Sequence, residues 1–156
     1  MSIYPSDASG LHHAGVHVAD MERSLRFYRD LLELEVLSDV LLTEPFVFEI
    51  AGLKAEAIRI VNLGVPGRDT LIVELLEYQG IERHPASARP CDPGSGHLCL
   101  EVTDIDAVNR RLRGAGHTAR ADAPTEIPGV RAKALYAADP DGYSIEFFQR
   151  PAASAA

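Results

Sequence analysis

Two histidines and two glutamates occupy matching places in two parts of this sequence. His13 and His97 each open a short run of residues that is typical of a β-strand. Glu74 and Glu146 each lie within an apolar run, LIVELLEY and YSIEFFQ respectively. A carboxylate between apolar neighbours in a strand is unfavourable without a partner. Imidazole nitrogens and carboxylate oxygens together suit a divalent metal such as Zn²⁺, Ni²⁺, Co²⁺, Fe²⁺ or Mn²⁺.

The alternation of side chains along a strand places these four residues on one side of the predicted sheets. Successive side chains point to opposite faces, so the aliphatic neighbours of each histidine and glutamate lie on the other face. An amphipathic helix would pack on that aliphatic face. If two such sheets curve together, the four candidate ligands converge on the side without helices. Such a site keeps coordination positions for water or substrate, which is typical of a catalytic metal.

Taken one at a time, each of the four residues is better explained as an ordinary polar residue of a strand. The metal hypothesis depends on all four standing at equivalent positions of a repeat. The same face is predicted to carry the side chains that shape a substrate pocket. These are His17, Ile72, Cys99, Glu101 and Phe148.

An internal repeat supports this interpretation. The segments HAGVHVADMERSLRFYRDLL and HLCLEVTDIDAVNRRLRGAG each combine a strand-like run, an aspartate seven residues after the histidine and an amphipathic helix pattern. Asp20 and Asp104 are the predicted helix N-caps. Each half then closes with a strand that follows a turn, PGRD or DPDG. Further strands are predicted at 36–42, 46–50, 55–63 and 132–137, so the pattern indicates a strand–helix–strands module that occurs twice.

The length of 156 residues is typical of one domain. We expect a single domain over about 11–150, with module one at about 11–79, a Gly- and Pro-rich linker at 80–96 and module two at about 96–150. Residues 1–10 and 151–156 are expected to be tails.

The composition excludes several classes of protein. The net charge of −8 disfavours a nucleic-acid partner, and no apolar run is long enough to span a membrane. The first residues have neither a basic stretch nor an apolar stretch, so no signal peptide is expected. The two cysteines form no disulfide framework, which favours a cytoplasmic location.

The segments HAGVHVADMERSLRFY, LIVELLEY, GHLCLEV and DPDGYSIEFF resemble the vicinal oxygen chelate superfamily, the fold of glyoxalase I, bleomycin-resistance proteins and extradiol dioxygenases. The resemblance covers about residues 11–149. It implies an α+β fold in which two βαβββ modules form a half-open, eight-stranded barrel around a metal. It also implies metal ligands at His13, Glu74, His97 and Glu146, a set similar to that of glyoxalase I and methylmalonyl-CoA epimerase. A homodimer is implied as well, with the site formed either within one chain or across a swapped dimer.

The resemblance suggests a metal-dependent lyase, isomerase or epimerase. One divalent metal, with Ni, Co or Zn favoured and Fe or Mn possible, would bind two oxygens of a small substrate and stabilise an enolate. By this resemblance Glu146 is the first candidate for the base that moves the proton, and Glu74 is the counterpart base for the other face.

Two alternatives remain open at this point. A ring-cleaving extradiol-type dioxygenase would use Fe²⁺ or Mn²⁺ and three ligands, without Glu74. A metal-free protein would bind a drug or metabolite in a dimer groove. The chain also departs from glyoxalase I, because His17 and Tyr78 stand where that enzyme has an arginine and an asparagine. Glutathione specificity therefore does not follow from the resemblance.

Overall fold

Two four-stranded mixed sheets form the frame of the protein in a computed structural model, which describes residues 10–68, 70–85 and 89–151. Sheet A contains β1 (Ala14–His17), β2 (Glu35–Leu42), β3 (Ala57–Gly64) and β4 (Leu71–Gln79) in the order β1-β4-β3-β2. Sheet B contains β5 (His97–Glu101), β6 (Thr125–Ile127), β7 (Ala132–Ala138) and β8 (Ser144–Gln149) in the order β5-β8-β7-β6. The predicted tails lie almost entirely outside the described residues.

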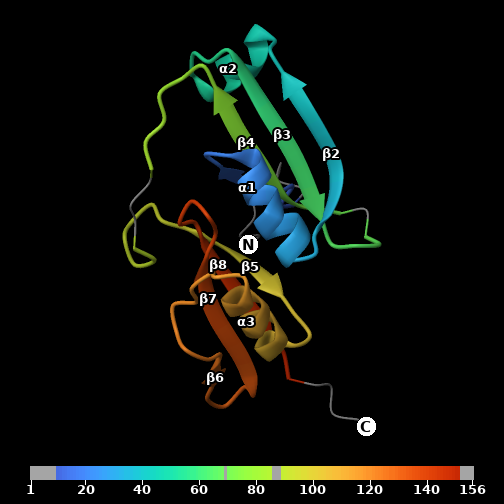
Figure 1. Cartoon of the computed structure of the whole chain (residues 1–156), viewed down its shortest axis with the longest axis vertical. Coiled ribbons are helices and arrows are strands. Elements are labelled where there is room, and N and C mark those ends of the chain that lie inside the picture. Colours follow the sequence, from blue (N-terminus) through green and yellow to red (C-terminus); the bar gives the residue numbers. More distant parts are fainter. Residues whose placement is uncertain (1–9, 69, 86–88, 152–156) are drawn as a thin grey trace, which may run out of the picture.

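The two sheets repeat one pattern of pairing. In each sheet the first strand runs parallel to the last, and the other neighbours are antiparallel. One helix covers one face of each sheet, α1 over sheet A and α3 over sheet B (Figure 1). The predicted βαβββ modules are therefore confirmed. The sheets are half-open and do not close into a barrel.

Both predicted N-caps are confirmed. Asp20 accepts a hydrogen bond from the backbone N–H of Arg23 at 2.8 Å and begins α1 (Met21–Leu25). Asp104 accepts one from the N–H of Ala107 at 2.9 Å and begins α3 (Ile105–Gly114). The first helix then continues as a π-helical stretch, η1 (Arg26–Leu31), so it is longer than α1 alone.

The prediction of a strand at 46–50 is wrong. That segment forms a short helix, α2 (Pro45–Ala51), in which Pro45 occupies the first turn, where no N–H is needed. Gly52 ends the helix in the left-handed conformation with φ of 65°. These two end signals outweigh the β-propensity of the aromatic and branched residues between them.

The aliphatic faces of both sheets pack into one core between the sheets and the helices. Buried side chains from both halves contribute to it, including Val16, Leu75, Leu98, Ile145 and Phe147. This is the face on which an amphipathic helix was expected. The alternating residues, which include the four candidate ligands, therefore belong to the opposite faces.

A buried hydrogen bond joins the two halves. The hydroxyl of Tyr28, in η1, donates to Asp139 Oδ2 at 2.9 Å, and Asp139 also accepts from the N–H groups of Asp141 and Tyr143 in the turn before β8. Asp141 in turn pairs with Arg23 of α1. Within the described part of the chain, no helix has the length and apolar character needed to cross a membrane.

Candidate metal centre

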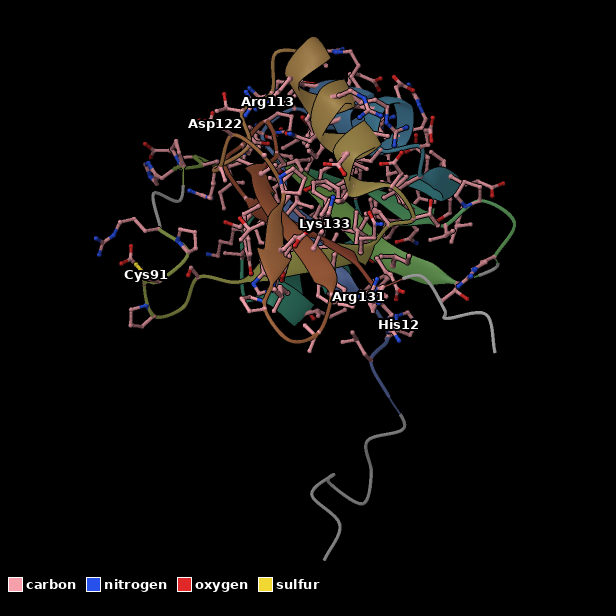
Figure 2. All side chains as sticks on the ribbon, turned by 90° about the horizontal axis from the view of Figure 1, so that it is seen from below. His12, Cys91, Arg113, Asp122, Arg131 and Lys133 are labelled. Carbon is pink, nitrogen blue, oxygen red and sulfur yellow. The ribbon has the colours of Figure 1, made fainter. Side chains whose placement is uncertain are left out.

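The first histidine–glutamate pair lies at the edge of sheet A. Strand β1 runs beside β4 with Gly15 opposite Glu74, and His13 directly precedes β1. His13 Nε2 lies 3.4 Å from Glu74 Oε2. We call this pair half-site A. His12 lies next to it, with its Nδ1 2.6 Å from the Nδ1 of His13, and Figure 2 shows His12 on the side of the molecule away from α3.

The second pair occupies the equivalent place in sheet B. His97 is the first residue of β5, which runs beside β8 with Cys99 opposite Glu146. His97 Nε2 lies 2.9 Å from Glu146 Oε2. We call this pair half-site B. The hydroxyl of Tyr136, on β7, donates to the same Glu146 oxygen at 3.0 Å and lies 3.4 Å from His97 Nε2.

The structure thus brings the four candidate ligands together as two pairs. Across the described residues, no three His, Cys, Asp or Glu side chains form a group that could hold a metal ion. Each half-site offers one imidazole nitrogen and one carboxylate oxygen, which are compatible donors for a borderline divalent metal. The complete set of two nitrogens and two oxygens therefore requires the two half-sites to meet.

Two of the predicted pocket residues belong to sheet A. His17, at the end of β1, stacks on Tyr78 with ring centroids 5.8 Å apart and an interplanar angle of 16°. Ile72, on β4, is half-buried and packs against the main core. His17 therefore has an aromatic partner that sequence reasoning did not assign to it.

The other three predicted pocket residues belong to sheet B. Cys99 is exposed, but partial desolvation, and then the neighbouring Glu146 carboxylate, raises the pKa of its thiol, so this thiol stays protonated beside half-site B. Glu101 forms an ion pair with Arg150 at 2.9 Å. Phe148 is half-buried and lies opposite Glu101 in the sheet register.

Sequence reasoning missed Tyr136, the side chain that contacts both members of half-site B. Its strand was predicted, but its place opposite Glu146 depends on the register between β7 and β8. Burial, and then the hydrogen bond to Glu146, raises the pKa of the Tyr136 hydroxyl, which remains a donor. By contrast, Cys91 is exposed on a loop that projects away from the sheets (Figure 2) and contributes to neither half-site.

Residues 10–147 match the family model of the Glyoxalase/Bleomycin resistance protein/Dioxygenase superfamily. The chain belongs to this superfamily. A lactoylglutathione lyase from Neisseria meningitidis is 30% identical over 144 residues, which cover 90% of each chain. A lactoylglutathione lyase from Haemophilus influenzae is 26% identical over 137 residues, which cover 88% of this chain and 90% of the relative.

A solved structure of a glyoxalase family protein from Bacillus cereus has the same fold. The TM-score is 0.79 at 15% identity, and the alignment covers 97% of this chain and 100% of the other. At this identity the likeness concerns the fold alone. The predicted superfamily and fold class are both confirmed.

Proposed function

We propose that the protein is a divalent-metal-dependent lyase or isomerase that acts on a small oxygen-chelating substrate. Its site would combine half-site A of one chain with half-site B of a second copy. One observation carries this proposal. Two His–Glu pairs stand at equivalent positions of two repeated sheets, and within one chain each pair supplies only part of a ligand set.

An exposed apolar surface supports the proposed dimer. Large apolar side chains are exposed on β2 and on α2, among them Leu41 at 59%, Phe46 at 59% and Ile50 at 82% relative exposure. Phe46 and Ile50 are four residues apart in α2 and share one side of that helix. Contiguous exposed apolar surface is typical of protein–protein interfaces. A second copy is the partner that would also complete the ligand set.

The chain's own residues would hold the metal and move a proton next to a carbonyl. A divalent metal held by His13, Glu74, His97 and Glu146 would supply stabilisation of negative charge on the substrate oxygens. Glu146 takes the proton from the carbon beside the carbonyl and returns it to the same or the neighbouring carbon, so no net proton is gained or lost. Tyr136 holds Glu146 Oε2 by a hydrogen bond and so fixes the carboxylate in place. Glu74 is the corresponding base on the opposite side.

The relatives suggest the first substrate class to test. Several of them are named lactoylglutathione lyases, and the corresponding reaction interconverts a hemithioacetal of a 2-oxoaldehyde and a thioester of a 2-hydroxy acid. The carbon that loses its proton carries the hydroxyl and is bonded to the carbonyl carbon, so two oxygens on adjacent carbons are available to the metal, as the proposed chemistry requires. The identity of the substrate thiol is left open, because His17 stands four residues after His13, where glyoxalase I has an arginine.

Complementation between two inactive variants tests the shared site directly. In a shared-site dimer of His13→Ala and His97→Ala chains, one site carries both substitutions and the other carries none. Each variant alone should lose stoichiometric Ni²⁺, Co²⁺ or Zn²⁺ after reconstitution. Unfolding and refolding the two variants together should restore one intact site in each mixed dimer, measured as bound metal by mass spectrometry and as hemithioacetal turnover.

The same experiment has clear contrary outcomes. Wild-type protein that binds no metal after reconstitution contradicts the metal proposal. Metal binding that is lost in both variants and never recovered on mixing contradicts the sharing of the site between chains. Refolding each variant alone is the control, because it reproduces the treatment without the possibility of complementation.

A further inference from the structure

A cationic side chain, Arg120, lies on the same face of sheet B as half-site B. The backbone N–H of Arg120 donates to the carbonyl of Tyr136 at 2.7 Å. Its neighbour Ala119 is bridged to Ala137, and both are buried in the main core. Because side chains alternate along an extended segment, the side chain of Arg120 lies on the opposite face, with that of Tyr136.

Ser144 connects Arg120 to half-site B. Arg120 Nη2 donates to Ser144 Oγ at 3.2 Å. In the sheet register Ser144 lies opposite His97 on one side and opposite Ala138 on the other. Ser144 is two residues before Glu146 on the same strand face, a separation of about 7 Å, so one small molecule can contact both Arg120 and Glu146.

An open pocket of about 370 Å³ includes Tyr136, the residue that contacts half-site B, in its lining. Its lining comprises Pro90, Arg120, Ala121, Thr125, Ala134, Leu135 and Tyr136. The volume lies toward the lower end of ligand sites, which span roughly 300–1,000 Å³. Apart from the hydroxyl-bearing Thr125 and Tyr136, its walls are apolar side chains with one cation, so it suits a short chain with one charged end.

The charge around Arg120 favours an anion. Among the residues that the structure describes, Arg120 has no carboxylate partner, whereas the nearby Arg113 is paired with Asp122 at 3.3 Å (Figure 2). The protein as a whole carries a net charge of −8. A planar guanidinium matches the two oxygens of a carboxylate. A single cation balances one carboxylate, and a phosphate dianion would leave a negative charge uncompensated in this pocket.

We propose that Arg120 binds a carboxylate of the substrate in this pocket, so that the protein selects oxygen chelators that carry a second, anionic end. The binding of the chelating end to a metal rests on the proposed function, whereas the binding of the carboxylate by Arg120 does not. Arg120 would thus be a residue that determines substrate specificity and takes no part in the proton transfer.

Metal-free protein provides the first test. Succinate is added to ¹⁵N-labelled apoprotein while the arginine Nε–H resonances are recorded by NMR. We expect a saturable shift of the Arg120 resonance. The backbone amide resonances of Ser144 and Tyr136 should also shift, and these shifts should saturate at the same succinate concentration. In Arg120→Ala the changes at Ser144 and Tyr136 should disappear, and in the matched control Arg110→Ala, on the outer face of α3, they should persist. No saturable shift at Arg120, or stronger binding of inorganic phosphate, overturns the carboxylate assignment.

Protein reconstituted with Co²⁺ provides the second test. Acetohydroxamate and the monohydroxamate of succinate share one chelating group, and only the second carries a carboxylate tail. Their dissociation constants are read from the visible Co²⁺ absorption. The tail should strengthen binding to wild type and to Arg110→Ala by about 10- to 100-fold, the range of a charge-assisted hydrogen bond. Arg120→Ala should lose this advantage and still bind acetohydroxamate, and Arg120→Lys should retain part of it.

The two tests separate this inference from the proposed function. An equal advantage of the tail in wild type and Arg120→Ala, or no advantage in either, overturns the role of Arg120 and leaves the metal site intact. A succinate shift at Arg120 in a protein that never binds Co²⁺ supports the carboxylate site and contradicts the metal proposal.

Discussion

Half-site A and half-site B have the same frame but different surroundings. In each, a histidine at the start of the first strand meets a glutamate on the parallel neighbouring strand. The side chains of Glu74 and Glu146 are almost equally exposed, at 20% and 19%. The frame alone therefore does not distinguish them.

The antiparallel neighbours of the two glutamates do distinguish them. Opposite Glu146 lies Tyr136, which donates a hydrogen bond to the carboxylate. Opposite Glu74 lies Asn62, whose amide donates to Ser38 at 2.9 Å. Both modules therefore keep the same His–Glu pair. Only in the second module does the neighbouring antiparallel strand add a hydrogen-bond donor, Tyr136, to the glutamate. We infer that half-site B is specialised for the proton transfer and half-site A for holding the metal.

The largest expected effect follows from this difference. Glu146→Gln removes the base and should lower turnover of the hemithioacetal by about 10²–10⁴-fold, the usual contribution of general acid–base catalysis. Glu74→Gln should lower it less, because the base in half-site B remains. Both are measured as kcat at saturating metal, with thermal unfolding to show that the fold is kept. Equal losses in the two variants would contradict the specialisation of half-site B.

The two modules also differ in how their last turns meet the neighbouring module. The turn before β8 holds the first helix of module one through Asp139 and Asp141, which meet Tyr28 and Arg23. The Tyr28–Asp139 contact is buried, and burial raises the pKa of the Tyr28 hydroxyl well above its ordinary value. In the turn before β4, the N–H of Gly67 bonds to the exposed Glu35 within its own module at 3.2 Å.

Removing one hydroxyl tests the importance of the joint between the modules. Tyr28→Phe leaves Asp139 without one buried donor and should lower the free energy of unfolding by about 1–3 kcal/mol. The measurement is urea denaturation monitored by circular dichroism. Tyr78→Phe is the matched control, because Tyr78 is also buried and makes no side-chain hydrogen bond to the described residues. Similar changes in the two variants would show that the Tyr28 hydroxyl has no special role.

Sequence patterns predicted most of this frame because they reflect local physics. Strand alternation placed His13 and Glu146 opposite the aliphatic faces, and the caps Asp20 and Asp104 follow from hydrogen bonds that lie within four residues. The segment 46–50 was misassigned because a short, nearly continuous apolar run is compatible with a strand and with a short helix, and its periodicity does not separate the two.

The remainder of the site depends on register and on the meeting of distant segments. Tyr136 reaches Glu146 from the neighbouring antiparallel strand, and Arg120 reaches Ser144 from a segment outside the named strands. A local sequence pattern predicts neither of these two contacts. Whether one chain or two supply the four ligands also depends on how the modules pack, which no spacing of residues determines.

The smallest predicted effect concerns the response of the inter-module joint to pH. Burial raises the pKa of the Asp139 carboxyl, although the Tyr28 hydroxyl and the backbone N–H groups of the turn oppose the shift. A carboxyl whose pKa is higher in the folded state binds its proton more tightly when folded. Its contribution to stability is therefore complete below the unfolded pKa and is lost as the pH rises through the folded pKa.

Asparagine keeps an acceptor at this position but cannot take up the proton. The stability of wild type relative to Asp139→Asn should therefore increase as the pH falls from neutral toward the ordinary carboxyl pKa of about 4, measured by urea denaturation at each pH. Asp20→Asn supplies a control of opposite sign, because the hydrogen bond from the N–H of Arg23 lowers the pKa of the Asp20 carboxyl. Its contribution is lost as the pH falls through that lowered pKa, so the advantage of wild type over Asp20→Asn should decline in acid. If both advantages declined together, the ionised form of Asp139 would be the one that stabilises the joint.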